Sequence, residues 1–381
     1  MMAHEHLRPA GPGLGQKIRR LHWPFVALVA VIGAIGYGVL YSAGGGSQEP
    51  WALRHLMRLA AGMGVMLVLA LVDVRLFFRW AYAAYGLVLG LLVVVEVMGE
   101  VNKGAQRWID LGVVQLQPSE LMKVVLVLVL ARYLHGAYLR DLRRPLSLLP
   151  PVLMIVLPAA LVLVQPDLGT AVTLLAAGTA VLFLAGVRLW KFALVGGLGA
   201  AALPVAWANL HDYQRQRVFT FLDPERDPLG AGYHIIQSKI ALGSGGLWGK
   251  GFLMGSQAQL SFLPEKQTDF AFTMLAEEAG FAGAILVLAL YLAVILAALV
   301  VALRCTHQFG RLLAMGVACN FTLYVVINVA MVTGLIPVVG VPLPLISYGG
   351  TAMLTVLASF GLLLSVDIHR NTPIPRYPGE L

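Results

Sequence analysis

Residues 269–303 read DFAFTMLAEEAGFAGAILVLALYLAVILAALVVAL, and this stretch decides the fold class. A helix over all of it would be about 50 Å long at 1.5 Å per residue, whereas the hydrocarbon core of a bilayer is about 30 Å thick. Its first turns carry Asp269, Glu277 and Glu278, which are costly to bury in lipid. We therefore expect a membrane-spanning helix whose acidic first turns project above the membrane or line a cavity.

The rest of the chain has the same apolar character. Hydrophobic residues make up 59% of the 381 residues and charged residues only 12%, and the mean hydropathy of +0.81 lies far outside the range of soluble globular proteins. The apolar runs are continuous and do not alternate, which excludes a membrane β-barrel. The net charge of +8 is divided among short basic clusters between apolar runs, as topology signals are, so we expect no nucleic-acid partner.

Ten apolar windows follow one another, and each crossing of a bilayer needs about 20 apolar residues. The windows are 24–42, 55–72, 77–97, 113–133, 148–165, 168–187, 189–207, 269–303, 312–334 and 350–367. We therefore expect an all-α polytopic membrane protein with about ten transmembrane helices and a large, partly helical outer loop at about 208–268. The membrane domain is expected at 24–367, between a cytoplasmic N-terminal segment, 1–23, and a cytoplasmic tail, 368–381.

The positive charges between the windows predict the orientation of the chain. If the N-terminus is cytoplasmic, the loops after every second window lie on the same side of the membrane, and all of them carry basic residues. These residues are Arg75, Arg79, Arg140, Arg143, Arg144, Arg188, Lys191, Arg304, Arg311, Arg370 and Arg376. Both termini are then cytoplasmic, and the long loop faces outward.

Two outer segments are expected to be ordered. Residues 233–253, YHIIQSKIALGSGGLWGKGFL, combine an amphipathic helical pattern with a glycine-rich turn, as in a segment that lies in the membrane interface or re-enters the protein. Residues 334–350, GLIPVVGVPLPLISYGG, hold three prolines and a Gly-Gly pair, which predicts an irregular or re-entrant loop that closes one side of a cavity. Ser347 and Tyr348 are then either substrate-side polar groups or members of an ordinary turn.

Ionisable residues at membrane depth are the first candidates for a site, because they usually face a cavity, a partner or a substrate path. Glu120 and Lys123 are three residues apart and share one helix face near the outer end of their window. They form either an internal ion pair that locks two helices or a substrate contact, and spacing alone does not decide between them. Asp167 begins the sixth window beside a proline, where the local sequence favours a helix N-cap.

Basic and aromatic residues mark the outer interface. Arg107 and Trp108 precede the fourth window, where a tryptophan is usually an aromatic-belt anchor. Arg215 and Arg217 alternate with glutamines in the long loop. The two arginines are either part of a solvated basic surface or an electrostatic clamp for a phosphate group, for which arginine geometry is well suited.

Asp269 lies in LPEKQTDFAF, residues 263–272, directly before the longest apolar run. Thr268 or Asp269 could simply cap the helix that follows. Pro264 and Glu265, however, give the loop a fixed approach, and basic groups from other outer segments could converge on the same cavity. A carboxylate between apolar walls and cations has the adjustable pKa that a general base requires. The spacing supports a site at Asp269 without naming a reaction.

Five motifs together resemble the SEDS family (shape, elongation, division and sporulation), and the resemblance runs from the first window to the tenth. The motifs are NKGAQRWIDLGVVQLQPSELMK, QPDLGTA, YQRQRVFTFLDPERDPLGAGYHIIQSKIALGSGGLWGKG, FLPEKQTDFAFTMLAEEAGF and GLIPVVGVPLPLISYGG. Within the family, DPERDPLGAGYHIIQS and WGKG resemble the elongation branch more than the division branch. One departure is visible at Lys266 and Gln267, where relatives often carry Arg–His.

The resemblance implies a ten-helix glycosyltransferase of the bacterial inner membrane that polymerises lipid II into peptidoglycan strands, for cell-wall elongation and rod shape. It implies an active site that faces the periplasm and binds lipid II and polyprenyl-pyrophosphate-linked glycan. It also implies two protein partners, a class B penicillin-binding protein that cross-links the strands as a transpeptidase, and the elongation machinery. The catalytic aspartate of the family lies in the TDF motif, which places it at Asp269.

The implied reaction needs one base and several cations. The 4-hydroxyl of the incoming sugar attacks the anomeric carbon with inversion, and pyrophosphate leaves without protonation, so a second carboxylate is not required. Mg²⁺ or Mn²⁺ could help to stabilise the leaving group, although the sequence shows no dedicated ligand cluster and no cofactor is certain. Asp269 is the expected base, and the expected substrate-binding residues are Arg107, Trp108, Glu120, Lys123, Asp167, Arg215, Arg217, Glu265, Ser347 and Tyr348.

Three alternatives are a lipid II flippase, a division-type member of the family, and a scaffold without an active site. Transport of a head group needs cavity charges that are accessible from both faces of the membrane, whereas polymerisation needs them only at the outer face. The charged candidates all fall at the outer ends of their windows, which favours the enzyme. A polymerisation assay with purified protein and lipid II would separate these functions.

Overall fold

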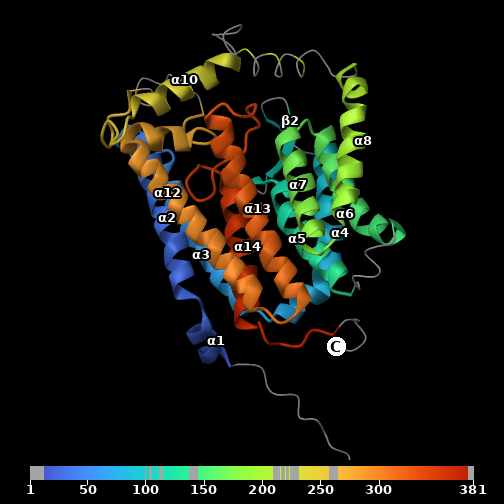
Figure 1. Ribbon diagram of the computed structural model, residues 1–381. Coiled ribbons are helices and arrows are strands. Elements are labelled where there is room, and N and C mark those ends of the chain that lie inside the picture. The colour runs from blue at the N-terminus through green and yellow to red at the C-terminus, as the bar shows by residue number, and fades with distance from the viewer. Residues whose placement is uncertain are drawn as a thin grey trace, which may run out of the picture.

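The computed structural model describes residues 13–98, 100–102, 105–110, 115–136, 145–208, 215, 219, 223, 231–256 and 265–375. Its helices are α1 (Leu14–Arg20), α2 (Trp23–Ala43), α3 (Ala52–Leu71), α4 (Val74–Met98), α5 (Pro118–Gly136), α6 (Pro145–Val164), α7 (Leu168–Leu184), α8 (Leu189–Ala208), α10 (Ala231–Ser244), α12 (Ala271–Arg304), α13 (Gln308–Val332) and α14 (Gly350–Ile368). Its strands are β1 (Glu100–Asn102), β2 (Ala105–Asp110) and β3 (Gln115–Leu116). Each predicted window coincides with one of the described long helices (Figure 1).

Length and apolar composition allow seven of the described helices to cross a membrane: α2, α3, α4, α6, α12, α13 and α14. α7 and the part of α8 from Leu189 to Ala202 are apolar but shorter. α5 differs from these helices because it holds Glu120, Lys123 and Arg132. The all-α polytopic class is confirmed, whereas the number of ten crossings and the boundaries at 23 and 367 stay predictions.

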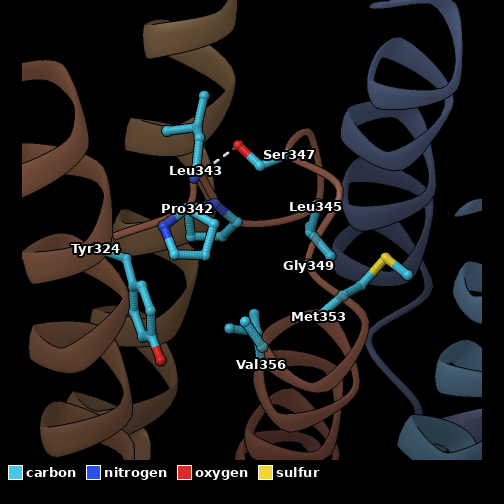
Figure 2. Close-up of a pocket in the computed structure, with 10 residues that line it drawn as sticks. Tyr324, Pro342, Leu343, Leu345, Ser347, Gly349, Met353 and Val356 are labelled. Carbon is cyan, nitrogen blue, oxygen red and sulfur yellow. Dashed lines mark hydrogen bonds between the residues drawn. The ribbon is translucent and has the colours of Figure 1, made fainter. Parts of the chain in front are cut away.

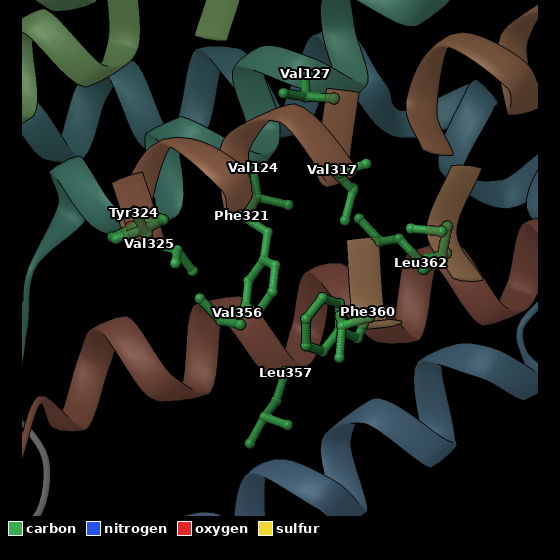
Figure 3. Packing of buried hydrophobic residues seen from close by; sticks show 14 of the residues in the cluster. Val124, Val127, Val317, Phe321, Tyr324, Val325, Val356, Leu357, Phe360 and Leu362 are labelled. Atoms are coloured by element: carbon green, nitrogen blue, oxygen red, sulfur yellow. The ribbon is translucent and has the colours of Figure 1, made fainter. Parts of the chain in front are cut away.

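α13 runs through the bundle and contacts α5, α7, α12 and α14, while α14 packs along α3 (Figure 1). Lipid tails are as apolar as leucine side chains, so close packing rather than the hydrophobic effect holds such helices together. Phe321 of α13 meets Phe360 of α14 nearly edge to face, with ring centroids 5.1 Å apart (Figure 3). A β-carbon at Gly316 would lie 2.3 Å from Val127 Cγ1, so glycine allows the close approach of α13 to α5.

A small antiparallel sheet, in the order β1-β2-β3, joins α4 to α5, and a purely helical class does not anticipate it. Trp108 pairs with Glu100, and Ile109 pairs with Leu116. Strands this short carry little periodic signal beside long apolar windows. The helix expected from residue 113 therefore begins only at Pro118, and proline suits a first helical turn because it lacks an N–H.

The spanning helix expected at 269–303 is present as α12, but α12 is broken. Helical geometry is interrupted at Gly280, which has φ 69° and ψ −169°. We call residues 271–279 the first segment of α12 and residues 281–304 its second segment. Residues 271–278 are buried on all sides, whereas the second segment alternates buried and exposed apolar residues. The excess length is thus used for a separate buried segment ahead of the spanning one.

The two outer segments expected to be ordered are ordered. α10 and the turns that follow it make the long loop partly helical. Residues 333–349 join α13 to α14 without helix or strand, and Gly334 and Gly340 take positive φ values of 76° and 73°. This connection, called here the 333–349 loop, is largely buried from Val341 to Ser347. Irregular backbone at membrane depth is tolerated only when it is buried in protein, as it is here.

Candidate functional site

Asp269 lies in the turn 265–270 that leads into α12. The turn closes on the carbonyl of Glu265, which accepts hydrogen bonds from Thr268 N at 3.0 Å and Phe270 N at 3.4 Å. The Thr268 hydroxyl donates to Glu265 Oε2 at 3.1 Å. The N-cap of α12 is Phe270, and no side chain caps this helix. The interpretation of Thr268 or Asp269 as the cap is therefore wrong.

The backbone of this turn is held from two sides. Asn328 of α13 donates through Nδ2 to Asp269 O at 3.0 Å and to Val341 O at 2.7 Å. Tyr348 N donates to Gln267 O at 2.7 Å. The turn that carries Asp269, α13 and the 333–349 loop are thus joined by hydrogen bonds, which fix the position of the carboxylate.

The carboxylate of Asp269 lies over the 333–349 loop. A β-carbon at Gly340 would be 3.7 Å from Asp269 Oδ2, and the φ of 73° at Gly340 also favours glycine. The same loop touches the start of α7, because a β-carbon at Gly169 would lie 2.4 Å from Val339 O. The loop therefore stands between Asp269 and the beginning of α7.

Glu120 and Lys123 form the ion pair that their spacing predicts. Lys123 Nζ lies 2.7 Å from Glu120 Oε1, and the two residues are 1% and 3% exposed. Tyr324 of α13 completes the cluster, because its hydroxyl donates to Glu120 Oε2 and accepts from Lys123 Nζ at 2.8 Å. A buried pair is stable only when its remaining hydrogen-bonding groups are satisfied, and Tyr324 does this. The interaction of Glu120 with Lys123 is confirmed, and neither side chain points into lipid.

α13 connects this buried cluster to Asp269. Tyr324 and Asn328 are four residues apart and therefore neighbours on one face of the helix. Tyr324 bonds to the ion pair, and Asn328 bonds to the backbone of Asp269. A displacement of α13 at one of these contacts would shift the other.

Ser347 has the turn role that the sequence left open. Its side chain is buried, and its Oγ accepts a hydrogen bond from Leu343 N at 2.9 Å (Figure 2). The nearby cavity, with Tyr324 on one wall, has a volume of only about 10 Å³ and holds no more than one water. A substrate contact for Ser347 stays a prediction.

The ring of Tyr348 lies beside Arg58, a cation that is not among the predicted site residues. The guanidinium of Arg58, on α3, lies 4.6 Å from the centroid of the Tyr348 ring. A β-carbon at Gly350 would lie 3.1 Å from Arg58 Cζ, so the first residue of α14 leaves room for this group. Among the residues described, no carboxylate pairs with Arg58. The available signal was a basic residue inside an apolar window, since that window begins at residue 55.

Arg107 and Asp167 lie together beside the start of α7. Asp167 is the N-cap of α7, where it accepts from Thr170 N at 3.2 Å and from the Thr170 hydroxyl at 2.9 Å, so the capping prediction is confirmed. Arg107 Nε is 3.8 Å from Asp167 Oδ2 and donates to Gln165 O at 3.2 Å. Trp108, the next residue of β2, is half-buried. The arginine is therefore positioned by the end of α6 and the start of α7.

Of the two remaining predicted cations, Arg215 and Arg217, the structure describes only Arg215. Arg215 donates through Nη2 to Ala208 O at 2.9 Å, at the end of α8, and no described contact joins it to Asp269. Arg217 lies outside the described residues. Lys266 lies in the turn of Asp269, and burial lowers its pKa from the ordinary lysine value. Lys266 is thus the cation nearest to Asp269 in sequence.

A resident metal ion does not fit the described residues. Within the ranges that the structure covers, no three His, Cys, Asp or Glu side chains gather as ligands.

Residues 19–372 match the family model described as "Cell cycle protein", which covers FtsW, RodA and SpoVE. The chain belongs to this family. The FtsW/RodA/SpoVE match spans every helix from α2 to α14 together with the turn of Asp269, so the expected SEDS membership is confirmed and the chain is a multi-pass membrane protein.

Two relatives in this family match nearly the whole length of the chain. The peptidoglycan glycosyltransferase MrdB of Escherichia coli K12 is 45% identical over 361 residues, which are 92% of this chain and 95% of MrdB. A probable peptidoglycan glycosyltransferase FtsW of Trichlorobacter lovleyi is 36% identical over 93% of this chain and 95% of its own. The division-type protein is therefore the more distant of the two.

Solved structures agree with this placement. A chain from a peptidoglycan synthase complex that coordinates polymerization and crosslinking is 36% identical, with a TM-score of 0.78 over 93% of this chain and 99% of that one. The rod shape determining protein RodA of Thermus thermophilus is 32% identical, with a TM-score of 0.68 over 93% of this chain and 98% of that one. At these identities the likeness extends from fold to family.

Proposed function

We propose that the protein is a peptidoglycan glycosyltransferase of the elongation branch, which polymerises lipid II with Asp269 as general base. The observation that carries this proposal is the position of Asp269 in a hydrogen-bonded turn that it does not use to cap α12. Hydrogen bonds from Asn328 and Tyr348 to the backbone of this turn hold Asp269 at a fixed position, as a general base requires. The similarity to MrdB over 92% of the chain supports the same activity.

The proposed reaction is an inverting displacement at the anomeric carbon of the growing strand. Asp269 accepts the proton of the 4-hydroxyl as the hydroxyl oxygen forms the new glycosidic bond. The bond from the anomeric carbon to the pyrophosphate oxygen breaks, and the pyrophosphate leaves with the electron pair on its polyprenyl carrier. The turn, Asn328 and the 333–349 loop hold the carboxylate in place for this step.

Cations stabilise the negative charge of the leaving pyrophosphate. Arg58 and Arg107 are proposed as phosphate-binding groups, because a guanidinium matches phosphate oxygens and both lie on elements that meet the 333–349 loop or its neighbours. Lys266 lies in the turn of the base itself. Lys123 has a buried carboxylate and a hydroxyl as partners, which supports the structural role left open by the sequence.

The location and partners are proposed from the family to which the chain belongs. The reaction is proposed at the periplasmic side of the bacterial inner membrane, with both termini cytoplasmic and the lipid tails of lipid II and of the glycan carrier in the bilayer. The partner is a class B penicillin-binding protein, a transpeptidase that cross-links the strands within the elongation machinery. The likeness to a chain of a complex that coordinates polymerization and crosslinking supports this partner.

The test is polymerisation of lipid II by purified protein carrying Asp269→Asn. The amide keeps the size of the side chain but accepts no proton, so turnover should fall by roughly 100-fold or more. The melting temperature should change little, because no cap is lost. Glu49→Gln is the matched control, since Glu49 is an exposed acid whose contact is a 4.0 Å pair with Arg54, and it should keep wild-type turnover.

The two possible failures are distinct. Wild-type protein that moves lipid II across a membrane but forms no glycan would contradict the polymerase and favour a flippase, which needs no proton abstraction. Asp269→Asn protein that polymerises at the wild-type rate would remove Asp269 from the reaction while leaving the activity itself in place.

A further inference from the structure

The glycine-rich turn after α10 closes the break in α12. We call residues 245–256 the splint loop. Its backbone donates from Lys250 N to Glu277 O and from Gly251 N to Glu278 O, both at 3.0 Å. It also accepts, at Gly246 O from Phe281 N at 2.9 Å and at Leu247 O from Ala282 N at 3.0 Å.

These four bonds satisfy the groups that the break leaves without intrahelical partners. The carbonyls belong to the end of the first segment of α12, and the N–H groups belong to the start of the second. The approach is so close that a β-carbon at Gly249 would lie 2.0 Å from Glu278 O, and one at Gly245 would lie 2.2 Å from Ala276 O. Backbone hydrogen bonds and close contacts therefore hold the splint loop firmly against the break in α12.

The splint loop directs its lysine to a buried acid and exposes most of its large apolar side chains. Lys250 Nζ lies 2.6 Å from Glu277 Oε1 and 2.8 Å from Ser256 Oγ, and the Glu277 side chain is fully buried. Four large apolar side chains face the exterior instead: Leu247, 67% exposed, Trp248, 83%, Phe252, 56%, and Met254, 68%. A loop in water would have the opposite arrangement.

The splint loop also lies at the level where the spanning helices end. The second segment of α12 has 24 residues between 281 and 304 and α2 has 21, which at 1.5 Å per residue is about 36 and 31 Å, enough for a bilayer core of about 30 Å. Ser42, at the end of α2, donates its hydroxyl to Glu278, at the end of the first segment. The break and the loop that closes it are thus at one boundary of the membrane.

The exposed apolar side chains continue the membrane-facing surface of the helices. Phe281 and Leu286 of α12 are 61% and 59% exposed, and Phe281 is bonded through its N–H to the splint loop. Phe252 stacks on Tyr41 of α2, with ring centroids 6.3 Å apart. Beneath Phe252, an apolar groove of about 310 Å³ separates α2 from the first segment of α12.

We propose that the splint loop inserts into the bilayer, with Leu247, Trp248, Phe252 and Met254 at the boundary between head groups and hydrocarbon. The occupant of this surface is lipid, because the apolar surface is continuous with that of α2 and α12 at the depth where tryptophan is favoured. The first segment of α12, and the turn of Asp269 before it, are then held at a fixed height above the hydrocarbon. The insertion does not depend on the reaction that Asp269 performs.

The test is electron paramagnetic resonance of a nitroxide at position 248 in lipid vesicles. The label is attached to W248C in protein carrying Cys305→Ala and Cys319→Ala, and its collisions with oxygen, which enriches in lipid, are compared with those of a water-soluble nickel chelate. Two matched sites set the scale: E49C, on an outer loop with Glu49 paired only to exposed Arg54, and L286C, on the lipid-facing surface of α12. We expect oxygen collisions to dominate at 248 and 286, and nickel collisions to dominate at 49.

Two results would overturn the proposal. Nickel-dominated collisions at 248 would place the loop in water, and an immobile label that neither reagent reaches would show that protein covers it. If W248C does not fold, quenching by vesicles of lipid brominated on the acyl chains answers the same question. The fluorescence lost in Trp248→Phe should be the quenched component, and failure of bromolipid to quench it would again contradict insertion.

Discussion

Asp167 and Asp269 show how one local pattern leads to two outcomes. Each acid stands just before an apolar run, and the sequence offers a capping role for both. Asp167 takes that role, with both carboxylate oxygens bonded to Thr170. At Asp269 the helix begins two residues later, at Ala271, and the cap position belongs to Phe270. The turn that closes on Glu265 makes this difference, and it depends on contacts with α13 and the 333–349 loop.

The buried pair of Glu120 and Lys123 gives a prediction at the residue scale. Lys123→Met leaves a carboxylate buried with only Tyr324 as partner, and removal of one member of such a pair costs about 3–5 kcal/mol. Combining Glu120→Gln with Lys123→Met removes both charges and should recover most of that loss. Chemical or thermal unfolding in detergent measures the difference.

Activity distinguishes the structural pair from a substrate contact. If the pair only locks α5 to α13, exchange of the two charges in Glu120→Lys with Lys123→Glu should restore turnover that each single change removes. A double variant that is folded but inactive would instead assign Lys123 to the pyrophosphate.

At the scale of elements, the break in α12 replaces intrahelical hydrogen bonds with those of the splint loop. Gly249 is the closest contact of that loop, so Gly249→Ala must displace either the loop or the carbonyl of Glu278. We expect a loss of roughly 1–3 kcal/mol in stability, as for overpacking and backbone strain. Gly243→Ala in α10 is the matched control, because a β-carbon there meets nothing within 4 Å. Equal stability of the two variants would contradict the splint.

α13 has a titratable cap, which gives a pH prediction. His307 Nδ1 accepts from Gly310 N at 2.9 Å, and burial, followed in smaller part by His135, His369 and Arg311, lowers the pKa of His307 to about 4. The unfolded state therefore binds the proton first as the pH falls. The contribution of His307 to stability is present above pH 6.5, its ordinary pKa, and is lost as the pH falls through 4.

His307→Asn tests the titration without removing the cap, because asparagine also accepts the N-cap hydrogen bond. Its melting temperature should fall less than that of the wild type between pH 7 and pH 4.5. His307→Ala should lose about 1 kcal/mol already at pH 7. Identical pH profiles for wild type and His307→Asn would show that the imidazole does not drive the acid loss.

At the scale of the whole molecule, the orientation of the bundle decides which surface carries the site. The basic loops predict that His307 and the residues after α14 are cytoplasmic, while α10, the splint loop and the turn of Asp269 are at the other end of the bundle (Figure 1). This orientation stays a prediction of the charge pattern.

Cysteine labelling of intact cells tests it. In protein without its two native cysteines, E49C should react with a membrane-impermeant maleimide from outside, and T372C should react only after the inner membrane is opened. Glu49, in the connection after α2, is exposed, and Thr372, in the segment after α14, is half-exposed. Labelling of T372C from outside would reverse the topology and place Asp269 in the cytoplasm.

Local sequence patterns predict the membrane class, the approximate positions of the long helices, the irregular 333–349 loop, the pairing of Glu120 with Lys123 and the family. Each of these depends on interactions between near neighbours in sequence or on the hydropathy of a window, since a backbone in lipid must satisfy its own hydrogen bonds locally. Family motifs gave Asp269 its catalytic role, since spacing alone supported a site there without naming a reaction.

The break in α12, the role of the splint loop that closes it, and the contacts of the turn of Asp269 depend instead on tertiary contacts. The break is stable because residues 246–251, some thirty positions earlier, supply its missing donors and acceptors. Asn328 of α13 and Tyr348 of the 333–349 loop donate hydrogen bonds to the turn of Asp269, and Arg58 of α3 lies against the Tyr348 ring. Such contacts join residues far apart in the chain, so no local pattern of polarity or spacing could contain them.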